Sequence, residues 1–284
     1  MQWSTTRFQI DLSAPRVMGI VNVTPDSFSD GGRHADAPAA LRHCERLLKE
    51  GADILDIGGE STRPGSPPVP LAEELARVLP VLREAVRLGV PVSVDTYKPG
   101  VMQAALDLGA DIVNDVWALR QPGAAEAVAR HGACGVCLMH MHGDPRTMQS
   151  APMAGDAVPQ VLLFLEQSAQ NLRRLEVEKT RIVLDPGIGF GKTVAQNFAL
   201  LARQDELLAA GYPLLAGWSR KSSIGAALQG DAPVPPAAAE RVAGSVAAAL
   251  MAVERGARIV RVHDVRETVQ ALAVWRQVRA QARR

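Results

Sequence analysis

The stretch VMGIVNVTPDSFSDGG, residues 17–32, shows the pattern on which the fold depends. It begins with aliphatic residues, which predict a buried strand, and this run ends at Asn22. The loop that follows is polar, carries Phe28 at its middle and ends in Gly31 and Gly32. A plain turn needs only about two to five residues and no aromatic ring. We therefore interpret this segment as a strand that ends in a functional loop.

Short aliphatic runs alternate with amphipathic segments along the rest of the chain. The expected strands are 17–23, 53–58, 91–96, 111–116, 135–140, 181–186, 213–218 and 258–263. The expected helices are 38–50, 71–86, 99–109, 123–131, 157–175, 196–210, 240–255 and 265–282. Eight strands, each followed by a helix, predict an α/β fold of the (β/α)₈ TIM barrel type.

Residues 1–284 are expected to form one such barrel domain with a short N-terminal extension. Residues 2–12 of that extension are expected to form a small hairpin or a strand that closes the bottom of the barrel. The alternative is an open doubly wound sheet. Such a sheet normally carries a phosphate-binding loop after its first strand, and residues 22–32 do not match one.

Composition narrows the class of function. The 284 residues are 47% hydrophobic, which supports a large core, and the net charge of +1 disfavours nucleic acid binding. The start of the chain has no secretory signal pattern, and the most apolar window, 242–253, is too short to span a membrane. We expect a cytoplasmic protein. Cys44, Cys134 and Cys137 form no disulfide framework, and the CxxC pair lacks the further ligands of a zinc site.

Polar side chains stand at the end of every predicted strand. In a barrel these ends meet at one mouth, where the active site lies. The residues at the ends are Asn22, Asp56, Asp95, Asn114, Asp115, His140, His142, Asp185, Ser219, Arg220, Lys221, Arg261 and His263. The pattern predicts a functional site at the mouth.

The chemistry of these residues indicates two kinds of ligand group. Asp95, Asn114 and Asp185 are compact hydrogen-bond acceptors, which suit a ligand with an edge of N–H groups. A second, cationic set suits a phosphate, a diphosphate or a ligand oxygen, and it comprises Arg220, Lys221, Arg261 and His263. Asn22 could hold Mg²⁺, which takes few protein ligands together with water and phosphate oxygens.

Two motifs suggest other functions, a phosphate-binding loop and a metal site, but neither matches its family pattern. Residues 187–193 resemble a phosphate-binding loop, but Pro186 occupies the position that the Walker A motif gives to glycine. The pair His140 and His142 resembles the metal-binding HxH of barrel hydrolases. In those enzymes the pair belongs to the first strand, whereas here it follows the fifth.

Taken together, eight motifs resemble the dihydropteroate synthase family, in family order and across nearly the whole chain. They are MGIVNVTPDSFSDGG (18–32), DIGGESTRPG (56–65), SVDT (93–96), IVND (112–115), LMHM (138–141), DPGIGFGK (185–192), SRKS (219–222) and VRVHD (260–264). Two positions depart from the family pattern: His142 stands where glutamine is usual, and Trp218 is also unusual.

The resemblance implies a transferase of folate synthesis. Such an enzyme joins 6-hydroxymethyl-7,8-dihydropterin diphosphate to 4-aminobenzoate, releases diphosphate, uses Mg²⁺, is commonly a homodimer and is a target of sulfonamides. Asn22 matches the Mg²⁺-linked position, and Asp95, Lys221 and Arg261 match catalytic positions. The loop from Asn22 to Gly32 is expected to act as a lid over the diphosphate and the aminobenzoate.

The resemblance also implies which residues bind each part of the substrates. The pterin is expected to contact Asp95, Asn114, Asp185 and Lys221. The diphosphate is expected to contact Thr62, Arg261 and His263, and Arg63 is a further substrate-binding candidate. The aminobenzoate pocket is expected to comprise Phe28, Thr62, Pro64, Phe190 and Ser219.

Two other functions are compatible with a pterin-binding barrel. One is a methyltetrahydrofolate-dependent methyltransferase, which shares the pterin carboxylates but binds no diphosphate. The cationic segments 219–221 and 261–263 favour the synthase. The other is a non-catalytic pterin-binding relative, which should lack some of the residues Asn22, Asp95, Asp185, Lys221 and Arg261, all of which are present.

Overall fold

The computed structural model describes residues 1–24, 36–61, 65–144, 148 and 150–282. The expected site residues Phe28, Thr62, Arg63 and Pro64 lie outside these residues, as does most of the expected lid. All other expected site residues lie within them.

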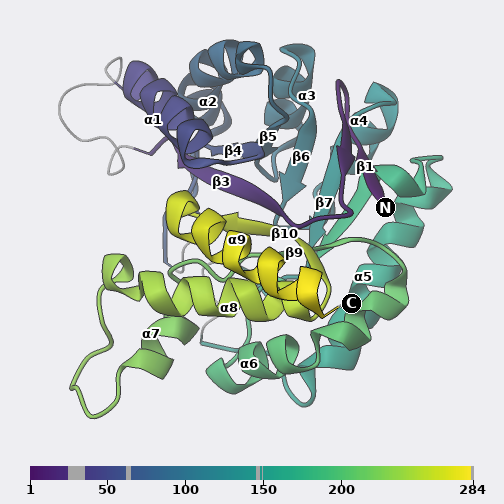
Figure 1. Ribbon diagram of the computed structural model, residues 1–284. Helices are drawn as coiled ribbons and strands as arrows, with labels where there is room; N and C mark the ends of the chain where they lie inside the picture. The colour runs from purple at the N-terminus through teal and green to yellow at the C-terminus, as the bar shows by residue number, and fades with distance from the viewer. Residues whose placement is uncertain (25–35, 62–64, 145–147, 149, 283–284) are drawn as a thin grey trace.

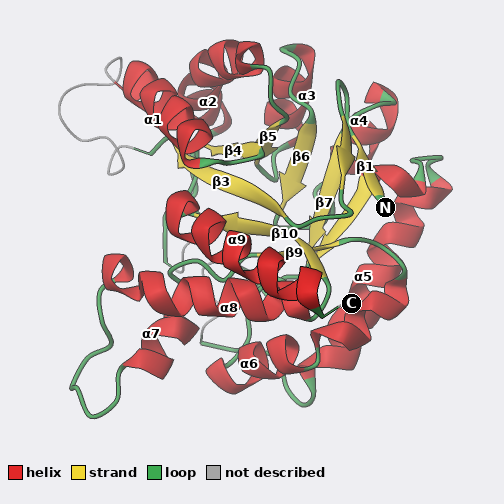
Figure 2. Ribbon diagram, viewed as in Figure 1, coloured by secondary structure: helices red, strands yellow, loops and turns green. Residues whose placement is uncertain are grey.

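Eight parallel strands close into a barrel in the order β10-β3-β4-β5-β6-β7-β8-β9. They are β3 (Arg16–Asn22), β4 (Ile54–Gly58), β5 (Val92–Asp95), β6 (Ile112–Asp115), β7 (Gly135–Met139), β8 (Ile182–Asp185), β9 (Leu214–Ala216) and β10 (Ala257–Val262). Helices surround this barrel (Figures 1 and 2). The predicted (β/α)₈ fold is confirmed, and each strand falls within two residues of its expected bounds.

The helices follow the predicted order with three differences. The main helices are α1 (Asp36–Glu50), α2 (Leu71–Ala85), α3 (Pro99–Asp107), α4 (Ala124–His131), α5 (Ala157–Arg174), α6 (Val194–Ala202), α7 (Ser222–Leu228), α8 (Val242–Glu254) and α9 (Val265–Gln281). The segment expected as one helix over 196–210 is α6 followed by the 3₁₀ helix η4 (Gln204–Ala210). Similarly, η5 (Ala238–Arg241) precedes α8, and shorter 3₁₀ turns are η2 (Val86–Leu88) and η3 (Lys179–Arg181).

Helix α7 was not predicted. It has only seven residues and includes Gly225, so its sequence shows no extended amphipathic stripe. It directly follows the predicted site segment 219–221, and its first residue is Ser222. This helix therefore lies next to the barrel mouth rather than in the outer ring alone.

The N-terminal extension closes the bottom of the barrel as a hairpin. Strands β1 (Gln2–Ser4) and β2 (Gln9–Asp11) pair antiparallel, with Trp3 opposite Ile10. Both residues pack against the inward-facing side chains of the strand beginnings: Met18, Ile54, Ile112, Cys137, Val183, Leu215 and Ile259. Trp3 is fully buried, and its indole N–H donates to the carbonyl of Arg181 at 2.9 Å.

Two further expectations concern features outside the barrel mouth. Cys44, Cys134 and Cys137 are buried and unpaired with one another. Among the helices of the described ranges, none has both the length and the apolar character needed to span a bilayer.

Candidate active site at the barrel mouth

Strand periodicity explains why polar residues gather at the mouth. Alternate residues of a strand point to the same side. Four of the seven strand residues that line the apolar bottom layer are followed, two positions later, by a polar residue at the same side of the strand. These pairs are Ile54 and Asp56, Ile112 and Asn114, Val183 and Asp185, and Ile259 and Arg261. The barrel interior thus changes from apolar at its closed end to charged at its open end.

Arg261 connects the strands across this polar layer. Its Nε donates to Asp56 Oδ2 at 2.6 Å, and its Nη2 donates to Asp95 Oδ2 at 2.5 Å. Asn114 Nδ2 donates to the same Asp56 oxygen at 3.1 Å. One guanidinium therefore joins residues of β10, β4 and β5, and the amide of β6 joins them through Asp56.

Asp56 has a more central position than the sequence indicated. We noted it at the end of its strand but gave it no role, whereas the structure places it fully buried between Arg261 and Asn114. Its Oδ1 atom has no hydrogen-bond partner among the described residues, and the same holds for Ser93 Oγ. Asp56 and Ser93 are register partners on β4 and β5. The strand parity that predicts Asn114 and Asp185 would also have indicated Asp56.

The charges of this cluster do not balance. Two buried carboxylates, Asp56 and Asp95, share the single guanidinium of Arg261. Burial raises the pKa of Asp95 to about 7, and the nearby Asp56 charge also raises it, although Arg261 opposes both effects. Burial lowers the pKa of Arg261, but Asp56 and Asp95 outweigh it and raise that pKa overall. The cluster therefore favours a ligand that brings hydrogen-bond donors.

Asp185 and Lys221 form the neighbouring part of the mouth. Asp185 Oδ1 accepts a hydrogen bond from the backbone N–H of Gly187 at 2.7 Å, and burial raises the pKa of this carboxyl. The ammonium of Lys221 lies 4.2 Å from the centre of the Phe190 ring. Lys221 also passes close to Gly189, where an added Cβ would lie 3.4 Å from its Cδ. The loop after β8 thus brings Phe190 and Lys221 together.

Lys192, the lysine of the apparent phosphate loop, points into the protein rather than toward a ligand. It is buried, and its Nζ donates to the carbonyls of Gly187 at 2.8 Å and Phe190 at 3.2 Å. It also lies 2.8 Å from His140 Nδ1. Burial lowers the pKa of Lys192 to about 7, and burial followed by the Lys192 charge lowers the pKa of His140 to about 2. Lys192 therefore fixes the loop that carries Phe190.

The HxH pair does not form a metal site in the structure. His140 is buried beside Lys192 and the ring of Phe164, whereas His142 is exposed. Across the part of the chain that the structure describes, no three His, Cys, Asp or Glu side chains are grouped to hold a metal. Trp218, the other departure, is buried in the core against Phe198, at 5.5 Å between ring centres.

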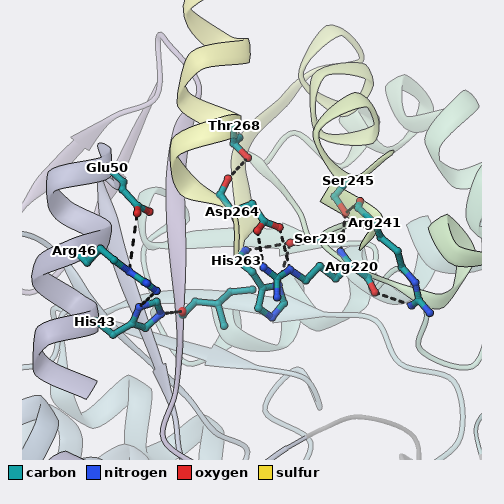
Figure 3. A network of polar contacts seen from close by, with 11 residues as sticks. His43, Arg46, Glu50, Ser219, Arg220, Arg241, Ser245, His263, Asp264 and Thr268 are labelled. Atoms are coloured by element: carbon teal, nitrogen blue, oxygen red, sulfur yellow. Dashed lines mark hydrogen bonds and ion pairs between the residues drawn. The ribbon is translucent and has the colours of Figure 1, made fainter. Parts of the chain in front are cut away.

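Ser219 and His263 lie together after the neighbouring strands β9 and β10 (Figure 3). Ser219 Oγ accepts from the backbone N–H of His263 at 3.0 Å and lies 3.0 Å from its Nδ1. The serine hydroxyl can thus donate to Nδ1, which places the proton of a neutral ring on Nε2. Arg220, which we expected to be a phosphate-binding cation, instead pairs with Asp264 through two hydrogen bonds of 3.0 and 2.6 Å.

Asn22 belongs to the same rim as the carboxylates. It ends β3 opposite Gly58, and Gly58 is opposite Asp95 on the next strand. Asp95 is in turn opposite Asn114. The half-buried Asn22 amide therefore stands in one row with the acceptors predicted for the ligand.

A closed parallel barrel with buried carboxylates and cationic side chains at its mouth defines a barrel enzyme with a small-molecule site. Comparison with known proteins identifies the group. Residues 18–263 match the family described as pterin binding enzyme. A dihydropteroate synthase of Neisseria meningitidis serogroup B is 54% identical over 278 residues, which cover 96% of each chain.

Solved structures give the same result. The Xanthomonas albilineans dihydropteroate synthase with 4-aminobenzoic acid has a TM-score of 0.88 and 52% identity, with 96% of each chain covered. The Burkholderia cenocepacia dihydropteroate synthase complexed with 7,8-dihydropteroate has a TM-score of 0.87 and 51% identity, with 99% of this chain and 98% of that chain covered. The chain belongs to the pterin-binding enzyme family and, within it, to the dihydropteroate synthases.

Proposed function

We propose that this chain joins 6-hydroxymethyl-7,8-dihydropterin diphosphate to 4-aminobenzoate, forming 7,8-dihydropteroate and diphosphate. The observation that carries the proposal is a set of acceptors beside Arg261 at the barrel mouth: the buried Asn114 and Asp185, and Asp95, whose side chain is 12% exposed. A pterin presents an edge of N–H groups, which such acceptors can bind in pairs. The related structures bound to 4-aminobenzoic acid and 7,8-dihydropteroate support the same substrates.

The pterin end of the substrate is proposed to lie deepest in the barrel. Asp185 and Asn114 accept from its N–H groups, and Lys221 donates to its ring oxygen or nitrogen. Asp95 faces the side of the ring toward the reacting carbon. The raised pKa values of Asp95 and Asp185 support these roles, because burial leaves both carboxyls short of donors that a pterin can supply.

The reaction is a displacement at the methylene carbon of the pterin. The bond from this carbon to the diphosphate oxygen breaks, and a bond to the aminobenzoate nitrogen forms as that nitrogen loses a proton. Arg261 and His263 stabilise the negative charge that develops on the leaving oxygens. Positive charge spreads into the pterin ring as the C–O bond stretches, and Asp95 stabilises it. The aromatic amine is already a nucleophile, so the site requires no strong general base.

Phe190 and Ser219 are proposed to contact the aminobenzoate. Phe190 lies against the Lys221 ammonium, and Ser219 lies beside His263, so both are next to residues proposed to bind the pterin diphosphate. Phe28, Thr62, Arg63 and Pro64 belong to the same proposal on the basis of sequence alone, since they lie outside the described residues.

The residues at the mouth fit a bound Mg²⁺. This ion typically keeps several waters and takes only one or two protein oxygens besides substrate phosphates. The Asn22 amide oxygen, at the rim beside the row of acceptors, suits that role. When bound, Mg²⁺ would neutralise charge on the diphosphate.

A turnover assay tests the proposed function. We expect dihydropteroate and diphosphate to appear in equal amounts when pterin diphosphate, 4-aminobenzoate and Mg²⁺ are mixed with the chain. Methyl transfer from methyltetrahydrofolate without dihydropteroate formation would instead identify a methyltransferase. Absence of both reactions, with pterin binding intact, would identify a non-catalytic relative.

The pterin site has its own test. Asp185→Asn should weaken pterin binding by about 10- to 150-fold, because a charge-assisted hydrogen bond contributes about 1.5–3 kcal/mol. Asp107→Asn, an exposed position on α3, is the matched control and should keep wild-type affinity. Wild-type affinity in Asp185→Asn, measured by calorimetry, would remove Asp185 from the site.

A homodimer in the cytoplasm is part of the same proposal, by analogy with the family. Size-exclusion chromatography coupled to light scattering measures the mass of the assembly directly. A mass near that of one 30.3 kDa chain, at the protein concentrations used for the assay, would contradict the dimer.

A further inference from the structure

Arg220 has a backbone conformation that is unfavourable for its side chain. Its φ is +58°, and within the described residues only Ala118, Leu119 and Glu176 share a positive φ without being glycine. It is the third residue of a tight turn in which the Lys221 N–H donates to the Trp218 carbonyl at 3.2 Å. Glycine is the usual residue where a turn needs positive φ at this position. An arginine persists there only if its surroundings hold it.

Three neighbours hold Arg220, one on each of its polar parts (Figure 3). The guanidinium pairs with both carboxylate oxygens of Asp264, at 3.0 and 2.6 Å. The backbone N–H donates to Ser245 Oγ at 2.9 Å, and the carbonyl accepts from Arg241 Nη1 at 3.0 Å. Backbone donor, backbone acceptor and side chain are all engaged, so rotation of the turn would break several hydrogen bonds together.

The neighbours are themselves fixed. The Ser245 hydroxyl donates to the Arg241 carbonyl at 2.6 Å, one turn earlier in the chain. Arg241 Nε donates to the Pro236 carbonyl at 2.9 Å, and its guanidinium packs so closely on α7 that a Cβ at Gly225 would lie 2.8 Å from it. The Asp264 carbonyl accepts from the Thr268 hydroxyl at 2.8 Å. The turn is thus tied to α7, α8 and α9 at once.

The residues on either side of Arg220 are the ones proposed to meet the substrates. Ser219 bonds to His263, and Lys221 lies over Phe190. The directions in which the Ser219 and Lys221 side chains point depend on the chain reversal at Arg220. We propose that Ser245 and Arg241 are positioning residues, which hold the Trp218–Lys221 turn with Asp264 so that Ser219 and Lys221 face the substrates. This inference rests on the proposed function.

Ser245→Ala tests the inference against a matched control. The substitution removes the acceptor of the Arg220 N–H and the bond from the Ser245 hydroxyl to the carbonyl four residues earlier. Ser168→Ala removes only the second kind of bond, because Ser168 Oγ donates to the Phe164 carbonyl at 2.8 Å on α5 and makes no other hydrogen bond among the described residues. We expect kcat/KM to fall roughly three- to tenfold in Ser245→Ala and to stay at the wild-type value in Ser168→Ala.

A second background, Arg220→Gly, separates positioning from a general loss of stability. Glycine adopts positive φ without cost, so the turn should need its neighbours less in Arg220→Gly. We expect Ser245→Ala to lower kcat/KM by a clearly smaller factor in the Arg220→Gly background than in the wild type. An equal factor in both backgrounds would show a merely structural role and overturn the inference. Arg241→Met should behave like Ser245→Ala.

Hydrogen exchange measures the turn without relying on catalysis. We expect the amides of residues 218–222 to exchange faster in Ser245→Ala than in the wild type and in Ser168→Ala. If the wild type makes dihydropteroate but the two serine variants have equal kinetics and equal exchange, the positioning role is wrong and the function stands. If the wild type makes none, the function is wrong, and unchanged exchange in Ser245→Ala would overturn the positioning role as well.

Discussion

Replacing Asp95 by asparagine should make the unliganded protein more stable at alkaline pH while impairing its activity. The pKa of Asp95 is about 7 in the folded protein against an ordinary value of 3.8, because burial and the charge of Asp56 favour its protonated form. Its side chain is only 12% exposed. Asparagine resembles the protonated carboxyl in shape and charge, so the variant lacks the charge that the fold disfavours.

The sign of the pH dependence of the unfolding free energy follows from the protons that Asp95 binds in the folded and unfolded states. Between about pH 4 and pH 7 the unfolded chain has released the Asp95 proton and the folded protein still holds it, so the free energy of unfolding falls as pH rises. Each pKa unit corresponds to about 1.4 kcal/mol, and a shift of about three units gives about 4 kcal/mol. Asp95→Asn loses this dependence, because it has no proton to release.

Urea unfolding at several pH values measures the effect. We expect the two proteins to have similar stability near pH 4, and the variant to gain on the wild type up to about pH 7, by an amount of order 4 kcal/mol. Carboxyls remote from the Arg261 cluster titrate alike in both proteins and cancel in the difference. The m-values should agree, since the folds are the same. A stability difference that does not change with pH would refute the assignment of a raised pKa to Asp95.

The other predictions concern four parts of the molecule. Arg261→Ala should weaken binding of the pterin diphosphate more than binding of a bare pterin, measured by calorimetry, because only the former carries phosphate charge; equal losses would contradict a diphosphate role. A chelator should suppress turnover and added Mg²⁺ should restore it, so full activity in chelator would exclude the metal. Lys192→Met should raise the KM for aminobenzoate about tenfold, and more than the pterin KM, because the loop bearing Phe190 loses the hydrogen bonds that Lys192 donates to it; equal changes in both KM values would argue against it. Trp3→Ala should lower the free energy of unfolding by about 3–5 kcal/mol, since it empties the closed end of the barrel; a loss below about 1 kcal/mol in urea would show that the hairpin does not stabilise the barrel.

Sequence patterns predicted the barrel because its strands are buried on both sides. Such strands appear as continuous aliphatic runs, and the eight runs matched the eight barrel strands within two residues. Helix α7 escaped prediction because seven residues around Gly225 give no periodic stripe. The break between α6 and η4 was also missed, since a 3₁₀ segment continues the same apolar pattern.

The candidate site could be predicted as a set of residues but not as a set of contacts. Strand ends locate Asp95, Asn114, Asp185 and Arg261 at the mouth, because parallel strands end together. The carboxylates that pair with the Arg261 guanidinium depend on how far the side chains extend across the barrel, and one of them is Asp56. Likewise, charge alone indicated Arg220 as a phosphate-binding residue, and no sequence pattern predicts its pairing with Asp264 or its positive φ.

The unbalanced charge of the mouth links stability to substrate binding. Asp95 retains its proton to about pH 7 because burial raises its pKa and because Asp56 shares the single cation of Arg261 with it. A pterin whose N–H groups face these carboxylates supplies the missing donors and favours their ionised form. Binding below pH 7 must then release a proton, and binding above it need not. The feature that costs stability in the empty barrel is therefore the one that selects a ligand rich in donors, and pterin affinity should rise as the pH increases toward 7.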